Sequence, residues 1–203
     1  KAIKDEWLKE WMPKLTSSET PINPYRLIRD MAQVLKPAET IITHDSGSPR
    51  DHLVPFWECT TPGGYIGWGK MTTLGASLGF AMGAKLARPE KTCVSFLGNA
   101  AFGMVAMDFE TAVRERIPIL VTLLNNSLLG GYSSNHPVAS ERYNLNKQTG
   151  EYAKIAEAVG GYAEKVEKPE EIILALRRAK KAMDSGQAAL LEFITREEGT
   201  FSL

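Results

Sequence analysis

The sequence has few cysteines, no long apolar run and no excess of basic charge, the features of disulfide-rich, membrane-spanning and nucleic-acid-binding proteins respectively. Only two of its 203 residues are cysteines, Cys59 and Cys93, and their spacing fits neither a metal site nor a redox pair, so we expect reduced thiols in a cytoplasmic protein. No apolar run approaches the roughly 20 residues that a membrane-spanning helix needs. The 24 basic and 24 acidic residues balance, which argues against nucleic acid or an anionic membrane as a partner.

The chain also lacks the usual features of a protein start. Residues 1–5 read KAIKD, with no initiator methionine and too much charge for a signal peptide, so we expect a piece of a longer protein. Residues 1–20 are largely polar, with Trp7 and Trp11 scattered among them, and they are predicted to form a linker or short helix in an N-terminal extension. Residues 21–203 are long enough to bury a full core as one domain.

Histidine is scarce as well, and the three side chains lack metal-ligand spacing. We expect His44, His52 and His136 in solvent-exposed or substrate-binding loops, with His44 and His52 the nearer to a site.

Strand-like and helix-like runs alternate along residues 21–203, and their order predicts the fold. Asn23 and Pro24 form a typical helix start, and Pro37 a helix stop. Strands are expected at 40–43, 94–97, 119–124, 163–166 and 189–195, and helices at 24–35, 73–87, 105–116, 150–159 and 169–183. Segments 44–50 and 128–148 are predicted to be loops. This alternation indicates an α/β fold, a doubly wound parallel sheet with helices on both faces.

Polar side chains follow two of the predicted strands at the point where each strand ends. Gly98 and Asn99 end the run 94–97, and Asn125 and Asn126 end the run 119–124. From Asn99 to Asn126 is 27 residues (99 to 126), which is room for one helix and one return strand, so both strand ends should reach the same edge of the sheet. Glycine lets the backbone approach an anion, and amide oxygens suit Mg²⁺ or Ca²⁺. The pattern therefore predicts a divalent cation that carries a diphosphate.

These residues resemble the thiamine-diphosphate-binding fingerprint, in which Gly-Asp-Gly is followed some two dozen residues later by Asn-Asn. The intervening stretch 109–119 (FETAVRERIPI) is also similar to acetolactate synthase-like enzymes. The resemblance extends from about Pro24 to Ile194 and corresponds to the C-terminal, diphosphate-binding domain of that family. It implies thiamine diphosphate and Mg²⁺ as cofactors.

The resemblance also implies the ligands of the cation. They are the side chains of Asn99 and Asn126 and the backbone carbonyl of Leu128. Asn99 stands where the family has aspartate, so the site loses one negative charge and we expect weaker Mg²⁺ binding with the same ligand geometry. The alternative is that Asn99 only caps the following helix or turn.

The cofactor contacts implied by the resemblance come from three segments. Gly98, Ala100 and Ala101 would bring backbone N–H groups to the diphosphate at a helix N-terminus. Ser48, in the loop 45–48 (DSGS), would donate its hydroxyl to the diphosphate, unless this loop is an ordinary Ser/Gly turn.

The segment 70–76 corresponds to the family's turn beneath the cofactor. There Leu74 would be the apolar wedge that bends the cofactor, and the carbonyl of Thr72 would accept a hydrogen bond from the aminopyrimidine. Met71 is the rival wedge if the turn is longer, and the alternative for Leu74 is the first core residue of a helix.

The implied function is that of part of an enzyme. The parent would be a lyase or transferase of acetolactate synthase-like type that decarboxylates or ligates 2-oxo acids. The family's activating glutamate lies in a pyrimidine-binding domain, in the same or a partner chain, and no such domain is visible here. We therefore assign no catalytic residue and expect the isolated chain to be inactive. The expected partners are that pyrimidine-binding domain, a small 2-oxo acid substrate and further copies of the chain in a homo-oligomer.

Two other functions stay open. The domain could be a degenerate, non-catalytic binding or oligomerisation domain with a weakened metal site at Asn99. A nucleotide-binding α/β domain is disfavoured, because no Gly-x-Gly-x-x-Gly follows a strand.

Overall fold

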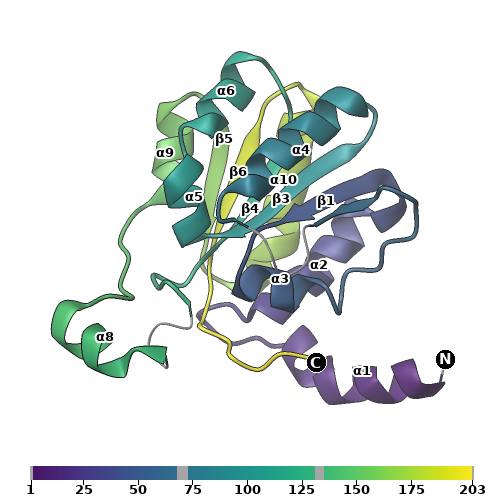
Figure 1. Cartoon of the computed structure of the whole chain (residues 1–203). Helices are drawn as coiled ribbons and strands as arrows, with labels where there is room; N and C mark the ends of the chain where they lie inside the picture. Colours follow the sequence, from purple (N-terminus) through teal and green to yellow (C-terminus); the bar gives the residue numbers. More distant parts are fainter. Residues whose placement is uncertain (1, 68–72, 131–134, 203) are drawn as a thin grey trace.

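A parallel sheet forms the centre of the computed structural model, which describes residues 2–67, 73–130 and 135–202 (Figure 1). The six strands lie in the order β2-β1-β3-β4-β6-β5, and every neighbouring pair is parallel. Their bounds are β1 Thr40–His44, β2 Tyr65–Ile66, β3 Thr92–Gly98, β4 Leu120–Asn125, β5 Tyr162–Val166 and β6 Ala189–Ile194. The register places Gly98 beside Leu124 and Asn125 beside Ile194, so the carboxyl ends of β3, β4 and β6 meet at one edge.

Helices cover both faces of this sheet. One face carries α2 Pro24–Leu35, α3 Ser48–Leu53 and α10 Ile172–Asp184, with α1 Ala2–Leu15 packed outside them on α2. The other face carries α4 Ala76–Ala87, α5 Asn99–Val105, α6 Asp108–Arg114 and α9 Tyr152–Ala158. Each set packs into its own buried apolar cluster against alternate strand residues. The predicted doubly wound α/β fold is therefore confirmed. No helix in the described part of the chain is long and apolar enough to cross a membrane.

The first helix of the predicted domain begins and ends where the sequence indicates. The side chain of Asn23 accepts a hydrogen bond from the Tyr25 N–H (3.0 Å), and Pro24 occupies the first turn of α2. Leu35 ends the helix, and Pro37 opens a short 3₁₀ turn that leads into β1.

The N-terminal segment is a helix that packs on the domain. Trp11 and Leu15 of α1 are buried in the same apolar cluster as α2, and Trp7 stacks on Phe56 with 4.8 Å between ring centroids. These contacts hold α1 against α2 and against the turn that follows α3.

Several short elements differ from the sequence prediction. The loop expected at 44–50 ends at Ser48, where α3 begins. The helix expected at 105–116 is the shorter α6, and α5 precedes it directly after β3. The loop expected at 128–148 contains α8 Pro137–Tyr143, which stands off the body (Figure 1). The helix expected from residue 73 begins at 76, and the edge strand β2 was not predicted. Elements of two to seven residues are too short to show a periodic apolar pattern.

Candidate functional site

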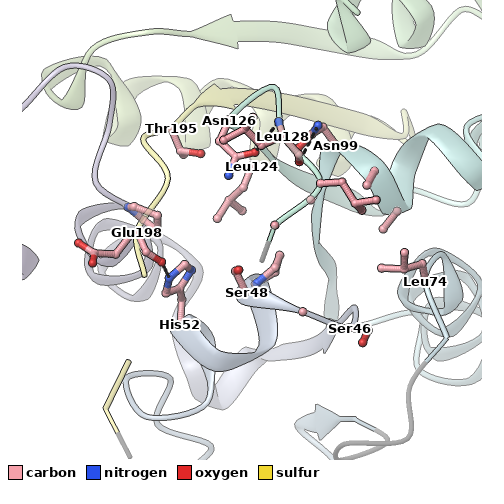
Figure 2. Close-up of a pocket in the computed structure, with 18 of the residues that line it drawn as sticks. Ser46, Ser48, His52, Leu74, Asn99, Leu124, Asn126, Leu128, Thr195 and Glu198 are labelled. Carbon is pink, nitrogen blue, oxygen red and sulfur yellow. Dashed lines mark hydrogen bonds between the residues drawn. The ribbon is translucent and has the colours of Figure 1, made fainter. Parts of the chain in front are cut away.

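The candidate site lies where the strand order reverses. The chain leaves β1 towards β2 on one side and returns to β3 on the other, and ligands of open α/β sheets bind outside the carboxyl ends of strands at such a point. A cavity of about 300 Å³ lies there, walled by the loops that follow β1, β3, β4 and β6 (Figure 2). The predicted site residues in the described ranges all line it: Ser48, Leu74, Gly98, Asn99, Ala100, Ala101, Asn126 and Leu128. Thr72 and the rival wedge Met71 fall outside the described residues.

Asn99 faces the loop after β4 from the first turn of α5. Its side chain is only 2% exposed, and Nδ2 donates to Oε1 of Gln148 (2.6 Å) and to the carbonyl oxygen of Leu128 (3.4 Å). The capping position belongs to Gly98, with no side-chain hydrogen bond, so the alternative that Asn99 is a helix cap is wrong. Burial raises the pKa of Tyr152, and a hydrogen bond between its hydroxyl and Asn99 opposes that rise.

Asn126 lies on the same side of the cavity as Asn99, as Figure 2 shows. Its Oδ1 accepts a hydrogen bond from the Leu128 N–H (3.0 Å), which turns the backbone so that residues 128–130 line the cavity. The two side chains and the Leu128 carbonyl therefore share one rim, as the sequence predicts.

Asn125 fixes this loop to the sheet, a role that sequence reasoning missed. Its Nδ2 donates to Oε1 of the fully buried Glu192 (2.7 Å), and its Oδ1 accepts from the Ser127 N–H (2.9 Å). The other carboxylate oxygen of Glu192 accepts from the Ala153 N–H (2.8 Å) at the start of α9. The available signal was a glutamate inside the apolar strand run 189–195, because a buried carboxylate needs partners.

Asp45, also missed, joins the loop after β1 to the turn before α4. Its fully buried carboxylate accepts from the Gly75 N–H with both oxygens (2.9 and 3.0 Å) and from the Ser77 hydroxyl (2.9 Å). Gly75 has φ +93°, and a Cβ there would lie 2.5 Å from Cγ1 of Val105. This turn holds Leu74 at the cavity wall before α4 begins, rather than inside a helix.

Ser48 begins α3 directly after Gly47, whose φ is +82°. A Cβ added at Gly130 would lie 3.1 Å from Oγ of Ser48, so the loop after β4 passes close to this hydroxyl. The lack of a side chain at Gly130 leaves the hydroxyl facing the cavity.

The far wall of the cavity comes from α3 and from the segment after β6. His52 Nε2 donates to the carbonyl oxygen of Glu198 (2.9 Å), whereas its buried Nδ1 has no hydrogen-bond partner within the described ranges. Burial lowers the pKa of His52. His44 lies in β1 and His52 in α3, and each is 2% exposed, so the expectation of loop or solvent-exposed positions is wrong for both. His52 nevertheless lines the cavity.

The rim of the cavity offers oxygen ligands of the type that a hard cation takes, but these ligands carry no negative charge. Asn99, Asn126 and the Leu128 carbonyl supply neutral oxygen atoms, the ligand type that Mg²⁺ and Ca²⁺ take. No cluster of three or more histidine, cysteine or acidic side chains suited to a metal occurs among the described residues. A cation here would therefore obtain its compensating charge from a bound anion such as a diphosphate.

Comparisons with known proteins give the family of this fold and site. Residues 45–193 match the family described as thiamine pyrophosphate enzyme, C-terminal TPP binding domain. The chain is 28% identical to an acetolactate synthase large subunit of Mycobacterium tuberculosis over 90% of this chain and 33% of that protein. It is 27% identical to a probable acetolactate synthase large subunit of Methanocaldococcus jannaschii (94% and 34%) and 26% identical to a putative thiamine pyrophosphate-containing protein of Bacillus subtilis (95% and 33%). The chain thus spans about a third of the length of these curated relatives.

The match covers more than half of the chain and includes the loops after β1, β3 and β4 that wall the cavity. The chain therefore belongs to the thiamine pyrophosphate enzymes, as an acetolactate synthase-like C-terminal TPP-binding domain, and this membership implies thiamine diphosphate with a divalent metal, typically Mg²⁺, as its cofactors.

Proposed function

We propose that this domain anchors the diphosphate of thiamine diphosphate through a divalent cation, as part of an enzyme that decarboxylates or ligates 2-oxo acids. The observation that carries the proposal is the convergence of loops from separate strands on one cavity. Residues chosen from sequence in four segments, at Ser48, Leu74, Asn99 and Asn126, all line that cavity. The anchoring unit in this proposal is residues 21–203, with residues 1–20 as an extension packed against α2.

The proposed cation ligands are the side-chain oxygens of Asn99 and Asn126 and the carbonyl oxygen of Leu128. Their support is a shared rim: all three residues line the cavity, and the Asn99 amide nitrogen lies 3.4 Å from the Leu128 carbonyl oxygen. Amide and carbonyl oxygens carry no formal charge, so the diphosphate supplies the negative charge that Mg²⁺ requires.

The proposed diphosphate contacts flank this rim. The backbone N–H groups of Ala100 and Ala101 belong to the first turn of α5, where orphan donors and the helix dipole favour an anion. The hydroxyl of Ser48 faces the same cavity and can donate to a phosphate oxygen.

Leu74 is the proposed wedge beneath the cofactor ring. It lines the cavity from the turn that the Asp45 carboxylate holds, so its backbone position is fixed by buried hydrogen bonds. The Thr72 carbonyl remains the proposed partner of the aminopyrimidine on the resemblance alone.

The chain's own residues hold and orient the cofactor. When bound, thiamine diphosphate supplies the nucleophilic carbon for addition to a 2-oxo acid. Asn99, Asn126 and Ser48 fix its diphosphate, and Leu74 positions its ring end. The proposed partners are a pyrimidine-binding domain with the activating glutamate and a further copy of the chain, and without them we expect no turnover.

Calorimetric titration tests this proposal. Thiamine diphosphate should bind the chain in the presence of Mg²⁺ and bind far more weakly with a chelator. Asn126→Ala should weaken binding about 10-fold to 100-fold, the range seen when a metal's supporting contacts are removed, whereas Gln33→Ala, on the exposed face of α2, should not.

One observation favours the alternative function, a degenerate binding or oligomerisation domain. The Asn99 amide already has two acceptors, Gln148 and Leu128, in a neutral arrangement that needs no cation. A degenerate binding or oligomerisation domain would keep this arrangement. Absence of metal-dependent binding, even when a pyrimidine-binding domain is supplied, would favour it over the cofactor domain.

A further inference from the structure

Gln148 contacts the cavity-lining residue Asn99 although it lies 20 residues after Leu128, beyond α8. Its N–H donates to the Ser127 carbonyl oxygen (2.9 Å), and Leu128 pairs with Lys147 in an antiparallel bridge. The backbone therefore holds Gln148 beside the loop that carries Asn126.

Two oxygen atoms converge on the side-chain nitrogen of Asn99. Oε1 of Gln148 lies 2.6 Å from Nδ2, and the Leu128 carbonyl oxygen lies 3.4 Å from it. Oxygens converge in this way on a positively polarised group, which the Asn99 N–H₂ provides. A half-turn of the Asn99 amide would bring its oxygen to the position of Nδ2, and three oxygens would then face one another.

Three oxygens this close repel unless a cation lies among them. Ligand bonds of 2.0–2.1 Å in octahedral Mg²⁺ sites place adjacent oxygens roughly 2.9 Å apart, and those of Ca²⁺ roughly 3.4 Å apart. The distances from Asn99 Nδ2 to Oε1 of Gln148 (2.6 Å) and to the Leu128 carbonyl oxygen (3.4 Å) lie on either side of the Mg²⁺ value.

We propose that Gln148 is a further ligand of the divalent cation, through Oε1, beside Asn99, Asn126 and the Leu128 carbonyl. The inference rests on the proposed function of the domain. A ligand at Gln148 would also compensate in part for the neutral side chain of Asn99, because an additional oxygen ligand replaces some of the attraction for the cation that a carboxylate at position 99 would contribute.

The test measures Mn²⁺ binding to the full chain by paramagnetic resonance of the free ion, at saturating thiamine diphosphate. Gln148→Leu keeps the side-chain size and removes the oxygen, and it should weaken Mn²⁺ binding about tenfold or more. Gln148→Glu adds a charge to the same oxygen and should tighten it. Gln187→Leu is the matched control, because Gln187 is exposed, does not line the cavity and donates its side-chain amide to the Gly160 carbonyl oxygen (3.5 Å), so the Mn²⁺ affinity of this variant should stay unchanged.

Three results would overturn the inference. Unchanged or tighter Mn²⁺ binding in Gln148→Leu would make the residue a hydrogen-bond partner of Asn99 only. If that variant does not fold, failure of Gln148→Glu to tighten binding overturns the inference equally. Wild-type chain that binds no Mn²⁺ with thiamine diphosphate rejects the proposed function and this inference together, whereas wild-type binding with insensitive Gln148 variants rejects the inference alone.

Discussion

The Asn99→Asp substitution should destabilise the domain without a divalent cation and tighten cation binding when thiamine diphosphate is present. Both effects follow from one side chain that is 2% exposed and faces oxygen atoms of Leu128 and Gln148. The wild-type amide meets those oxygens with N–H groups, whereas aspartate meets them with a second carboxylate oxygen.

The cation-free effect comes from a buried charge with poor partners. An uncompensated buried charge costs about 3–5 kcal/mol, but the Tyr152 hydroxyl and a reoriented Gln148 amide can donate to the carboxylate and offset part of it. We expect a net loss of about 2 kcal/mol in the free energy of unfolding. For a chain of this length that corresponds to a midpoint roughly 4–8 °C lower.

The effect with cation has the opposite sign. A carboxylate in place of an amide puts a full negative charge on a proposed ligand, and even the removal of an outer contact changes metal affinity about 10-fold to 100-fold. We therefore expect Mg²⁺ to bind at least about tenfold more tightly, which is about 1.4 kcal/mol.

Thermal unfolding by circular dichroism separates the two effects. The variant should melt below wild type in chelator, and Mg²⁺ with thiamine diphosphate should raise its midpoint by more than it raises that of wild type. Asn99→Ala is the control, since it removes the amide without adding charge and should gain less from Mg²⁺ than wild type does. Equal shifts of variant and wild type on adding both ligands would show that Asn99 faces no cation.

Three further substitutions test the rest of the site. Leu74→Ala should weaken thiamine diphosphate binding roughly tenfold, since one apolar contact to the ring is lost, and should leave inorganic pyrophosphate binding unchanged. Leu86→Ala, at an exposed position, is the control and should change the binding of neither ligand. An equal loss of affinity for both ligands in calorimetry would contradict the role of Leu74 as a wedge. Gly75→Ala should cost about 2–4 kcal/mol in urea unfolding, because φ is +93° and the new Cβ would meet Val105, and a loss below about 1 kcal/mol would contradict the strain. His52 has a native pKa below its unfolded value of about 6.5, so the native state binds fewer protons and stability should be complete above that pH and fall as pH drops through it. In urea unfolding, His52→Phe should remove the pH dependence of the free energy of unfolding that His52 contributes between about pH 5 and 7. An unchanged pH dependence would contradict the lowered native pKa of His52.

The sheet and its functional edge could be predicted because parallel topology leaves few choices. The continuous apolar run at 119–124 needs cover on both faces, and it forms the wholly buried β4. Once β3 and β4 are parallel neighbours, the residues after them, Asn99 and Asn126, must meet at one edge. The apolar pattern of the two strands and the rule that parallel neighbours end at the same edge of a sheet were enough to predict this meeting point.

The short elements around the cavity could not be predicted in the same way. Helices α3 and α5 have six and seven residues, too few for an apolar stripe, and their positions depend on packing against strands far along the chain. The contact between Asp45 and Gly75 spans 30 residues, and that between Asn99 and Gln148 spans 49. Nothing in a polar stretch marks which side chain will fold back to the site, so such partners emerge only from the tertiary structure.

The neutrality of the rim has a consequence for how the cofactors should bind. Mg²⁺ gives up its water reluctantly, and amide and carbonyl oxygens alone offer no charge to offset that loss. With Asn99 in place of an acidic ligand, the cation should have little affinity for the free chain, and the diphosphate should lack its counter-charge without the cation. Each must then raise the affinity for the other by the same factor, because coupling between two bound ligands is reciprocal. An aspartate at position 99 would give the cation a charged ligand before the diphosphate arrives and so would reduce that mutual dependence. In this chain, the proposed cation and cofactor are therefore best regarded as one ligand, held by a site that recognises the pair better than either member.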